Sequence, residues 1–256
     1  MADAARRREA RPQAVLEVVE RIQLNPHMVR IVAGGNGYAQ YHDNDSTDKY
    51  VKLSFTDTDG RSVTRTYTVR RSDPAGQRLT IDFVVHGDAG LAAPWARAAT
   101  AGDTLTLSGA GGGYRPDPAH DTHLFLGDES ALPAINAAFD ALPATARGTA
   151  FLEVSETRGS LDADVPAGVE IVWLERDEPG SRPQVLADAL AERGRPTGSL
   201  GVFAHGERES MKAVRKVLRD LTSDGDTVSI SGYWASGRTE DRFQAEKREP
   251  IGNIDG

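Results

Sequence analysis

The sequence predicts a two-domain α+β protein, with a six-stranded antiparallel β-barrel over residues 1–118 and an α/β domain with a parallel sheet and a C-terminal tail over residues 119–256. Three observations support this division. Strand-like segments follow one another in the first half, and strand and helix patterns alternate in the second. A proline-rich stretch, Pro116–His120, lies at the change of rhythm and predicts the domain boundary.

The barrel strands are predicted from a two-residue alternation of apolar and polar side chains. In the third strand, for example, Val51, Leu53 and Phe55 alternate with polar residues. A short helix is expected at Pro94–Ala99, and the polar stretch 34–49 is expected to be a surface loop. The six expected strands are Ala14–Gln23, Met28–Ala33, Tyr50–Thr56, Arg61–Arg70, Leu79–Val85 and Thr104–Ser108.

The second domain is predicted from strands that alternate with amphipathic helices, which implies a mostly parallel sheet. Such sheets bind ligands at the carboxyl ends of their strands. The tail after Gly237 is expected to be too polar to pack deeply. The expected strands are Thr122–Leu126, Thr149–Ser155, Val169–Leu174, Ser199–His205 and Thr227–Ser231, and the expected helices are Ala131–Ala141, Gln184–Glu192 and Glu209–Leu221.

Composition excludes several classes of function. Thirty basic and 38 acidic residues give a net charge of −8, which argues against broad nucleic-acid binding. The absence of cysteine excludes disulfides, iron–sulfur clusters and a thiol nucleophile. No apolar stretch reaches the ~20 residues that span a bilayer, and no signal peptide is evident. We therefore expect a cytoplasmic protein without a membrane partner, whose redox chemistry would need a bound cofactor.

The first motif is RTYTVR at Arg65–Arg70. On a strand, Arg65, Tyr67 and Val69 share one face. An aromatic ring between two arginines offers a flat surface for a planar ligand and positive charge for phosphate groups. The same residues are common on strand surfaces, so this pattern alone leaves both interpretations open.

The second motif begins at Asp82–Gly87, where a strand ends, and continues to a short helix that starts at Pro94. Gly90, Ala92 and Ala93 come just before that helix. Free backbone N–H groups beside such small side chains form a natural phosphate site. An ordinary connection between a strand and a helix would have the same composition.

Two further motifs follow strands of the second domain. Gly127–Ser130 lies after the first of them, where a nucleotide would bind, although Ser130 is equally suited to cap the next helix. Tyr233 and Trp234 follow the last strand. This aromatic pair would cover a flat ring or pack against the barrel.

Three other features resemble ligand-binding motifs and are weighed against a purely structural role. The glycine run Gly109–Gly113 is not followed by a helix and is expected to be a flexible turn, not a phosphate loop. His120 and His123 are spaced like metal ligands but have no third ligand nearby, so no metal site is expected. His205 ends a strand, where a nucleotide contact and a plain turn remain alternatives.

Taken in order, Arg-x-Tyr-Thr, Asp-Phe-Val-x-His-Gly, a Trp-Ala helix start, Gly-Asp-Glu-Ser-Ala-Leu-Pro-Ala and Gly-Tyr-Trp resemble the siderophore-interacting proteins. These are FAD-containing ferric-siderophore reductases of the ferredoxin–NADP reductase superfamily. The likeness runs from about Val15 to Gly237. It implies a Greek-key barrel that holds FAD, followed by an α/β domain that binds NAD(P)H.

The resemblance also implies roles for single residues. Tyr67 would stack on the isoalloxazine ring beside Arg65, and the pyrophosphate would lie at Ala92 and Ala93. The family usually has Ser or Thr where this chain has Ala93, which removes a hydrogen bond of about 1 kcal/mol. The predicted cofactor-binding residues are Arg65, Tyr67, Thr68, Val69, Arg70, Asp82, Phe83, Val84, Val85, His86, Gly90, Ala92, Ala93, Trp95, Tyr233 and Trp234, and the predicted nicotinamide-binding residues are Gly127, Asp128, Glu129 and Ser130.

The implied function is FAD-dependent reduction of a ferric siderophore. NAD(P)H supplies electrons in pairs and ferric iron accepts one, so a flavin must mediate between them. Ferrous iron then binds the siderophore more weakly and is released. No side chain has to act as acid, base or nucleophile. The substrate is expected over the exposed flavin edge, with Lys52, Arg238, Lys247 and Arg248 as candidate attractors of an anionic siderophore.

Alternatives remain at this point. An FAD enzyme using NAD(P)H could reduce free flavin, a quinone or another small acceptor, and a siderophore-binding protein would carry no flavin. The choice between NADH and NADPH stays open. A ferredoxin is an alternative electron donor, although most ferredoxins are acidic and this chain is too. The protein is expected to be a monomer.

Overall fold

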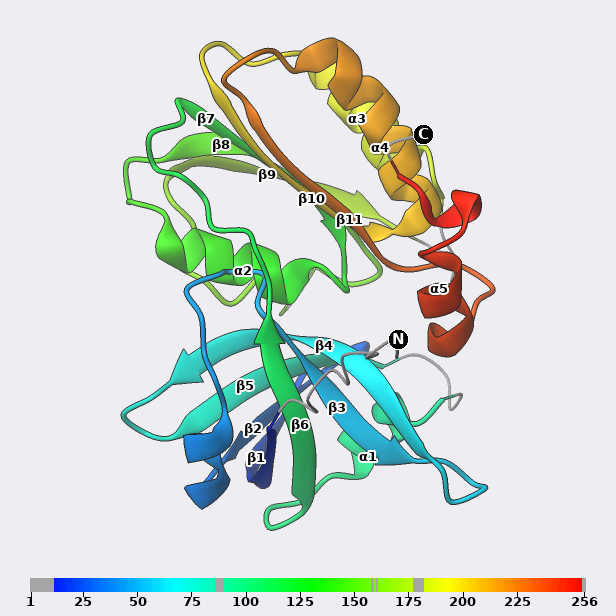
Figure 1. Cartoon of the computed structure of the whole chain (residues 1–256). Coiled ribbons are helices and arrows are strands. Elements are labelled where there is room, and N and C mark those ends of the chain that lie inside the picture. Colours follow the sequence, from blue (N-terminus) through cyan, green and yellow to red (C-terminus); the bar gives the residue numbers. More distant parts are fainter. Residues whose placement is uncertain (1–11, 86–89, 158, 160, 177–181, 255–256) are drawn as a thin grey trace, which may run out of the picture.

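The computed structural model describes residues 12–85, 90–157, 159, 161–176 and 182–254. The chain forms a β-barrel domain and a sheet domain that lie one against the other (Figure 1). No helix of the described residues is long and apolar enough to cross a membrane.

The predicted barrel is confirmed, and its six strands close in the order β1-β2-β5-β4-β3-β6. All neighbouring strands are antiparallel. Apolar side chains that alternate along each strand point inward and fill the barrel. The elements are β1 (Gln13–Asn25), β2 (Met28–Gly34), η1 (Asn36–Gln40), β3 (Tyr50–Thr56), β4 (Ser62–Asp73), β5 (Arg78–Val84), α1 (Ala92–Ala98) and β6 (Thr104–Gly111).

The second domain is the predicted parallel sheet, with strand order β11-β10-β7-β8-β9. Helix α2 covers the face toward the barrel, and α3 and α4 cover the other face (Figure 1). Both faces are therefore buried, as expected for parallel strands. The elements are β7 (Thr122–Asp128), α2 (Leu132–Ala141), β8 (Arg147–Val154), β9 (Gly168–Glu175), α3 (Val185–Arg193), β10 (Leu200–Glu207), α4 (Arg208–Leu221) and β11 (Thr227–Trp234).

Two expectations about loops were wrong. The stretch 34–49 carries the short helix η1, and its Tyr38 and Tyr41 are buried in the barrel core with ring centroids 5.6 Å apart. The glycine run is not a flexible turn, because β6 extends to Gly111. A Cβ at Gly111 would lie 2.3 Å from Cζ of Tyr50, so glycine is needed for the ring to pack there.

The expectation for the C-terminal tail was also wrong, because it packs closely. The tail forms α5 (Glu240–Glu246) and η2 (Pro250–Gly252) (Figure 1). The side chain of Phe243 is buried. Glu246 is 1% exposed and accepts hydrogen bonds from Arg208, Arg238 and Arg242 at 2.7–2.8 Å. These guanidinium groups hold the pKa of Glu246 at about 2. One buried carboxylate thus anchors a polar segment to the start of α4.

Ion pairs join the two domains. Arg70 on β4 donates to Asp140 of α2 at 2.8 Å and to the backbone carbonyl of Asp162, which follows β8. Arg30 on β2 forms two hydrogen bonds with Asp82 on β5, at 2.7 and 2.8 Å, and also contacts Asp162. The network holds α2 and the segment after β8 against β4 and β2 of the barrel.

Candidate functional site

The first part of the candidate site is the face of β4 that carries Arg65 and Tyr67. The Tyr67 ring is half-buried and packs on Phe83, with centroids 4.4 Å apart. Arg65 reaches Asp241 of α5, Nη1 to Oδ1, at 3.1 Å, and Asp241 is 68% exposed. A flat aromatic surface therefore lies beside a guanidinium whose one carboxylate partner within the described ranges, Asp241, is well solvated.

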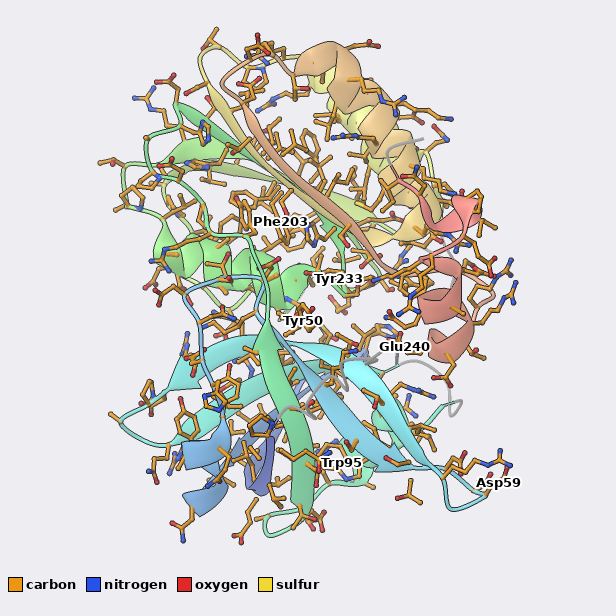
Figure 2. All side chains as sticks on the ribbon, viewed as in Figure 1. Tyr50, Asp59, Trp95, Phe203, Tyr233 and Glu240 are labelled. Atoms are coloured by element: carbon orange, nitrogen blue, oxygen red, sulfur yellow. The ribbon has the colours of Figure 1, made fainter. Side chains whose placement is uncertain are left out.

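The C-terminal helix α5 lies against this face. Burial raises the pKa of Tyr67, and the charge of Glu240 adds to the rise while Arg65 opposes it. Burial and the charge of Lys52 lower the pKa of Lys247, and Glu240 opposes that shift. Glu240 therefore lies close to both Tyr67 and Lys247, and Figure 2 places it beside the barrel.

Tyr233, at the end of β11, lies at the junction of the two domains near Tyr50 of the barrel (Figure 2). Burial raises the pKa of Tyr233; the charge of Asp48 adds to the rise and the Thr68 side chain opposes it through a hydrogen bond. Thr68 and Tyr233 were both predicted to contact the cofactor. The fold brings these two residues together from opposite domains.

His205 on β10 stands behind Tyr233, and sequence reasoning left its role undecided. Its ring stacks on Phe203 at 4.0 Å and meets the Tyr233 ring edge-on at 4.9 Å. Nε2 bonds Ser229 at 2.9 Å, while Nδ1 is buried without a partner among the described residues. Burial and the charge of Lys247 lower the pKa of His205 to about 3, so the ring is neutral and supports Tyr233.

Several residues of the predicted cofactor-binding set have structural roles instead. The side chains of Val69, Phe83, Val85 and Ala92 are buried in the barrel core. Arg70 and Asp82 are 2% and 4% exposed and are occupied by the ion pairs described above. We therefore assign their side chains to packing and not to cofactor contact. Val84 is half-buried, and His86 lies outside the described residues.

The predicted phosphate contact lies at the start of α1. No described side chain caps this helix, and Gly90 precedes it with φ 88° and open space around its Cα. Ala93 is half-buried, and Trp95 packs edge-on against Phe55 with centroids 5.8 Å apart. No side-chain cap from residues 12–85, 90–157, 159, 161–176 or 182–254 occupies the first turn of α1, as a phosphate contact would need.

In the predicted nicotinamide-binding segment, hydrogen bonds within the protein engage both carboxylate oxygens of Asp128. Oδ1 of Asp128 accepts from N and Oγ of Ser130, and its Oδ2 accepts from N of Glu207 and Nε1 of Trp234. Ser130 is therefore not the cap of α2. A Cβ at Gly127 would lie 2.6 Å from Cβ of Ala131, so this glycine allows α2 to approach the sheet. Asp128 joins the ends of β7, β10 and β11.

Carboxylates dominate the carboxyl edge of β7 and β8. Glu129 pairs with Arg176 and accepts from Ser155 at 2.6 and 2.7 Å. Glu153 is paired across the strands with Asp128, and its Oε1 lies 3.9 Å from Nε of Arg176. Burial raises the pKa of Glu153 to about 7, with Asp128 and Glu129 adding to the rise and Arg176 opposing it. The guanidinium of Arg176 at this edge is already paired with Glu129, which reduces the positive charge it offers to a dinucleotide phosphate.

We expect Glu153→Gln to gain stability relative to the parent as the pH rises. Unfolded, the carboxyl has its ordinary pKa of 4.5, so between pH 4.5 and about 7 the folded chain keeps a proton that the unfolded chain has lost. The free energy of unfolding of the parent therefore falls through this window, by roughly 3 kcal/mol. Urea denaturation across the window measures the slope. Glu175→Gln, at the exposed end of β9, is the control, and equal slopes in all three proteins would contradict the expectation.

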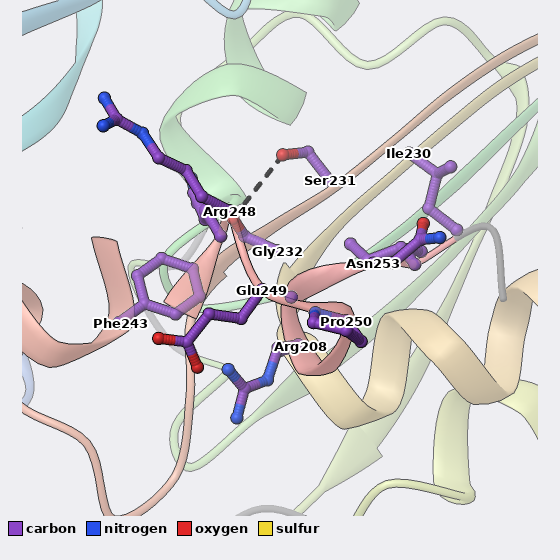
Figure 3. Close-up of a pocket in the computed structure, with 12 residues that line it drawn as sticks. Arg208, Ile230, Ser231, Gly232, Phe243, Arg248, Glu249, Pro250 and Asn253 are labelled. Atoms are coloured by element: carbon purple, nitrogen blue, oxygen red, sulfur yellow. Dashed lines mark hydrogen bonds between the residues drawn. The ribbon is translucent and has the colours of Figure 1, made fainter. Parts of the chain in front are cut away.

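A cavity of about 560 Å³ opens beside the junction of the two domains, between β11, the start of α4 and the tail (Figure 3). Lys247 and Arg248, two of the predicted substrate residues, line it together with Arg208, Ser231 and Phe243. Nζ of Lys247 lies 4.8 Å from the centre of the Phe243 ring.

The other two predicted substrate residues do not line this cavity. The guanidinium of Arg238 is turned to Glu246, and Lys52 on β3 is near enough for its charge to lower the pKa of Lys247. The structure therefore brings three of the four predicted residues, Lys52, Lys247 and Arg248, to one side of the junction.

Comparisons with known proteins identify the family of the chain. The family described as siderophore-interacting protein matches residues 120–237, and the siderophore-interacting FAD-binding domain matches residues 56–114. The chain belongs to the siderophore-interacting protein family.

Relatives of this family member include ferric vibriobactin reductase ViuB of Vibrio cholerae, 39% identical over 73% of this chain and 70% of that protein. The crystal structure of a siderophore utilization protein from T. fusca matches with a TM-score of 0.79 at 35% identity, over 89% of this chain and 94% of that one. A ferredoxin-NADP+ reductase from Plasmodium falciparum has the same fold, with a TM-score of 0.64 at 13% identity over 85% and 96% of the two chains.

The residues of this siderophore-interacting protein fit FAD. The dinucleotide needs a flat apolar surface for its ring and donors for its phosphates. Tyr67 presents a half-buried ring, Arg65 a guanidinium, and α1 an uncapped first turn. Among the described residues no cluster of three or more metal-ligating side chains is present.

Proposed function

We propose that this protein is an FAD-dependent reductase of ferric siderophores, which releases iron as Fe(II). One observation carries the proposal most directly. The C-terminal segment places the cavity lined by Lys247 and Arg248 next to the face formed by Arg65 and Tyr67. An anionic ferric complex held there would lie close to the proposed ring site.

The residues of the chain would bind and orient rather than react. Tyr67 would support the flavin ring, Arg65 and the first turn of α1 would bind its phosphates, and Tyr233 with Thr68 would cover it from the sheet domain. Bound FAD would supply the redox chemistry by accepting electrons in pairs and passing them on singly. His205 is neutral and buried, so it would hold Tyr233 and exclude water without transferring a proton.

NAD(P)H is the proposed electron donor, and ferredoxin is the second candidate. The amide of Ser130 already donates to Asp128, so this turn does not offer that N–H group to a dinucleotide phosphate. A dinucleotide phosphate would therefore need other contacts on the sheet domain.

An anaerobic absorbance experiment on the purified, FAD-loaded protein tests the function. NADH, NADPH or reduced ferredoxin is added in turn, followed by a ferric catecholate or hydroxamate and a ferrous-trapping dye. We expect the flavin band to bleach and to return as the ferrous complex forms. Bleaching with ferredoxin alone would identify the donor and retain the function.

Two outcomes would contradict the proposal. Equal turnover of quinones or free flavin without preference for ferric siderophores would favour a general flavin-dependent reductase. Protein that binds a siderophore but takes up no FAD would favour a siderophore-binding protein.

We expect charge reversal in the cavity to weaken substrate binding selectively. Lys247→Glu combined with Arg248→Glu should raise KM for an anionic ferric siderophore about tenfold or more, since each charged hydrogen bond contributes roughly 1.5–3 kcal/mol. The rate at saturation should change little. Lys216→Glu, on the exposed side of α4, is the matched control. Equal KM values for the double variant and the control would place the substrate elsewhere.

A further inference from the structure

A second cavity, of about 510 Å³, lies at the opposite edge of the parallel sheet. The segment before β7, the connection between α2 and β8, and the loop before β10 surround it. Its polar lining includes the side chains of His120, His123, Thr145, Arg147 and Thr197. The amino ends of the strands meet here, so this cavity shares no residue with the junction described above.

His123, near the start of β7, lines this cavity and has an unsatisfied ring nitrogen. The side chain is 1% exposed, and its ring stacks on Phe125 with centroids 6.3 Å apart. Nδ1 is buried and has no hydrogen-bond partner among the described residues. A buried polar atom without a partner is costly, and such atoms are rare in folded proteins. His123 is therefore a candidate ligand contact.

Glycines flank His123 on both neighbouring strands. The register pairs His123 with Gly148 on β8 and with Gly201 on β10. A Cβ at Gly201 would lie 3.1 Å from Nδ1 of His123 and 2.9 Å from Cδ2 of His120. Gly201 thus leaves space beside both imidazole rings, whereas the Cβ of another residue at this position would lie too close to them.

Arg147, the first residue of β8, supplies a positive charge to the same cavity. Its guanidinium forms no ion pair or hydrogen bond within the described residues. The acidic Asp121 on the lining is already engaged, because its Oδ2 accepts from N and Oγ of Ser199 at 2.9 and 3.0 Å. The carboxyl end of α2 carries a partial negative charge nearby, whose effect is smaller than that of a charged hydrogen bond.

We propose that this cavity binds a small oxyanion, held by the guanidinium of Arg147 and the imidazole of His123. A guanidinium and an imidazole nitrogen that lack other partners within the described part of the chain are the donor set that a phosphate-like or carboxylate group requires. Threonine hydroxyl groups on the lining can donate further hydrogen bonds. The site is independent of the proposed reductase activity.

Protonation of His123 should strengthen binding of the oxyanion. Burial and the charge of His120 lower the pKa of His123, and Asp117 opposes the shift. With Arg147 and Asp121 on the cavity lining, these are the titratable and charged groups around the ring among the described residues. A bound anion favours the imidazolium form, so affinity should rise as the pH falls from about 8 to about 6.

The test is a sulfate titration of the FAD-loaded protein with ¹³C-labelled histidine, at constant ionic strength set with chloride. We expect saturable shifts of the His123 ring resonance with a millimolar dissociation constant, and tighter binding at the lower pH. Sulfate is chosen because its charge is constant over this range. His123→Gln identifies the resonance, and a second titration with malonate distinguishes a tetrahedral oxyanion from a carboxylate.

Arg147→Gln should weaken sulfate binding about tenfold, as expected for the loss of one charged hydrogen bond. Arg147 is exposed, so this variant should fold normally. Arg78→Gln is the matched control, since Arg78 is an exposed residue on barrel strand β5 whose guanidinium also has no partner among the described residues. The proposal would be overturned by the absence of a saturable shift at His123, or by equal weakening in both variants.

Discussion

Replacing Arg30 by methionine is expected to lower the free energy of unfolding by about 3–5 kcal/mol, the usual effect of leaving one member of a buried ion pair alone. The side chain of Arg30 is 11% exposed and that of Asp82 is 2% exposed, and two hydrogen bonds at 2.7 and 2.8 Å join them. Without Arg30, the Asp82 carboxylate would remain charged in the barrel wall. Urea denaturation followed by circular dichroism measures the loss.

Two variants make this result specific. Arg30→Met combined with Asp82→Leu should recover most of the stability, because the buried charge is removed with its partner. Arg71→Met should change stability by less than about 1 kcal/mol, since Arg71 is 58% exposed and forms only a surface pair with Asp140. If Arg30→Met behaved like Arg71→Met, the network would not stabilise the barrel.

Replacing Arg65 by methionine is expected to give the largest effect on cofactor binding. Under the proposed function this guanidinium contacts an FAD phosphate, so its loss should weaken FAD binding tenfold to a hundredfold, or about 1.5–3 kcal/mol. The dissociation constant is measured from the quenching of flavin fluorescence as the apoprotein is titrated. Thermal denaturation of the apoprotein checks that the fold is retained.

The controls for Arg65 come from its own surroundings. Arg61→Met removes a 77% exposed arginine from the same region and should leave FAD affinity unchanged. Asp241→Asn removes the carboxylate that pairs with Arg65, so it should preserve or strengthen FAD binding. Equal affinities in Arg65→Met and Arg61→Met would show that Arg65 does not hold the phosphate.

Local patterns were sufficient for the architecture. Strand β3 runs from Tyr50 to Thr56, as the alternation of Val51, Leu53 and Phe55 predicts. The helix predicted at Glu209–Leu221 differs from α4 by one residue at its start. The period of apolar residues reports which face is buried, and that information lies within a few neighbouring residues.

The tail shows where such patterns fail. A segment rich in Arg, Glu and Asp predicts an exposed chain, yet Glu246 is buried because three arginines meet it, and one of them comes from α4. Thr239 followed by acidic residues was the available sign of a helix start, and it caps α5. The helix start could be predicted from neighbouring residues, whereas the burial of Glu246 depended on an arginine that is distant in the chain.

The amino-acid sequence by itself determined the two-domain fold, the order of the motifs and the family. Tertiary structure alone decided which polar residues of those motifs are available to a ligand. Arg65 and Arg70 belong to one motif. Arg70 forms ion pairs with Asp140 and Asp162, whereas Arg65 pairs with the solvated carboxylate of Asp241. The physical reason is that the availability of a charged side chain to a ligand depends on its ion-pair partners, and those partners lie far away in the chain. Apolar burial repeats with the local period of the backbone, whereas charge pairing is set by packing between domains.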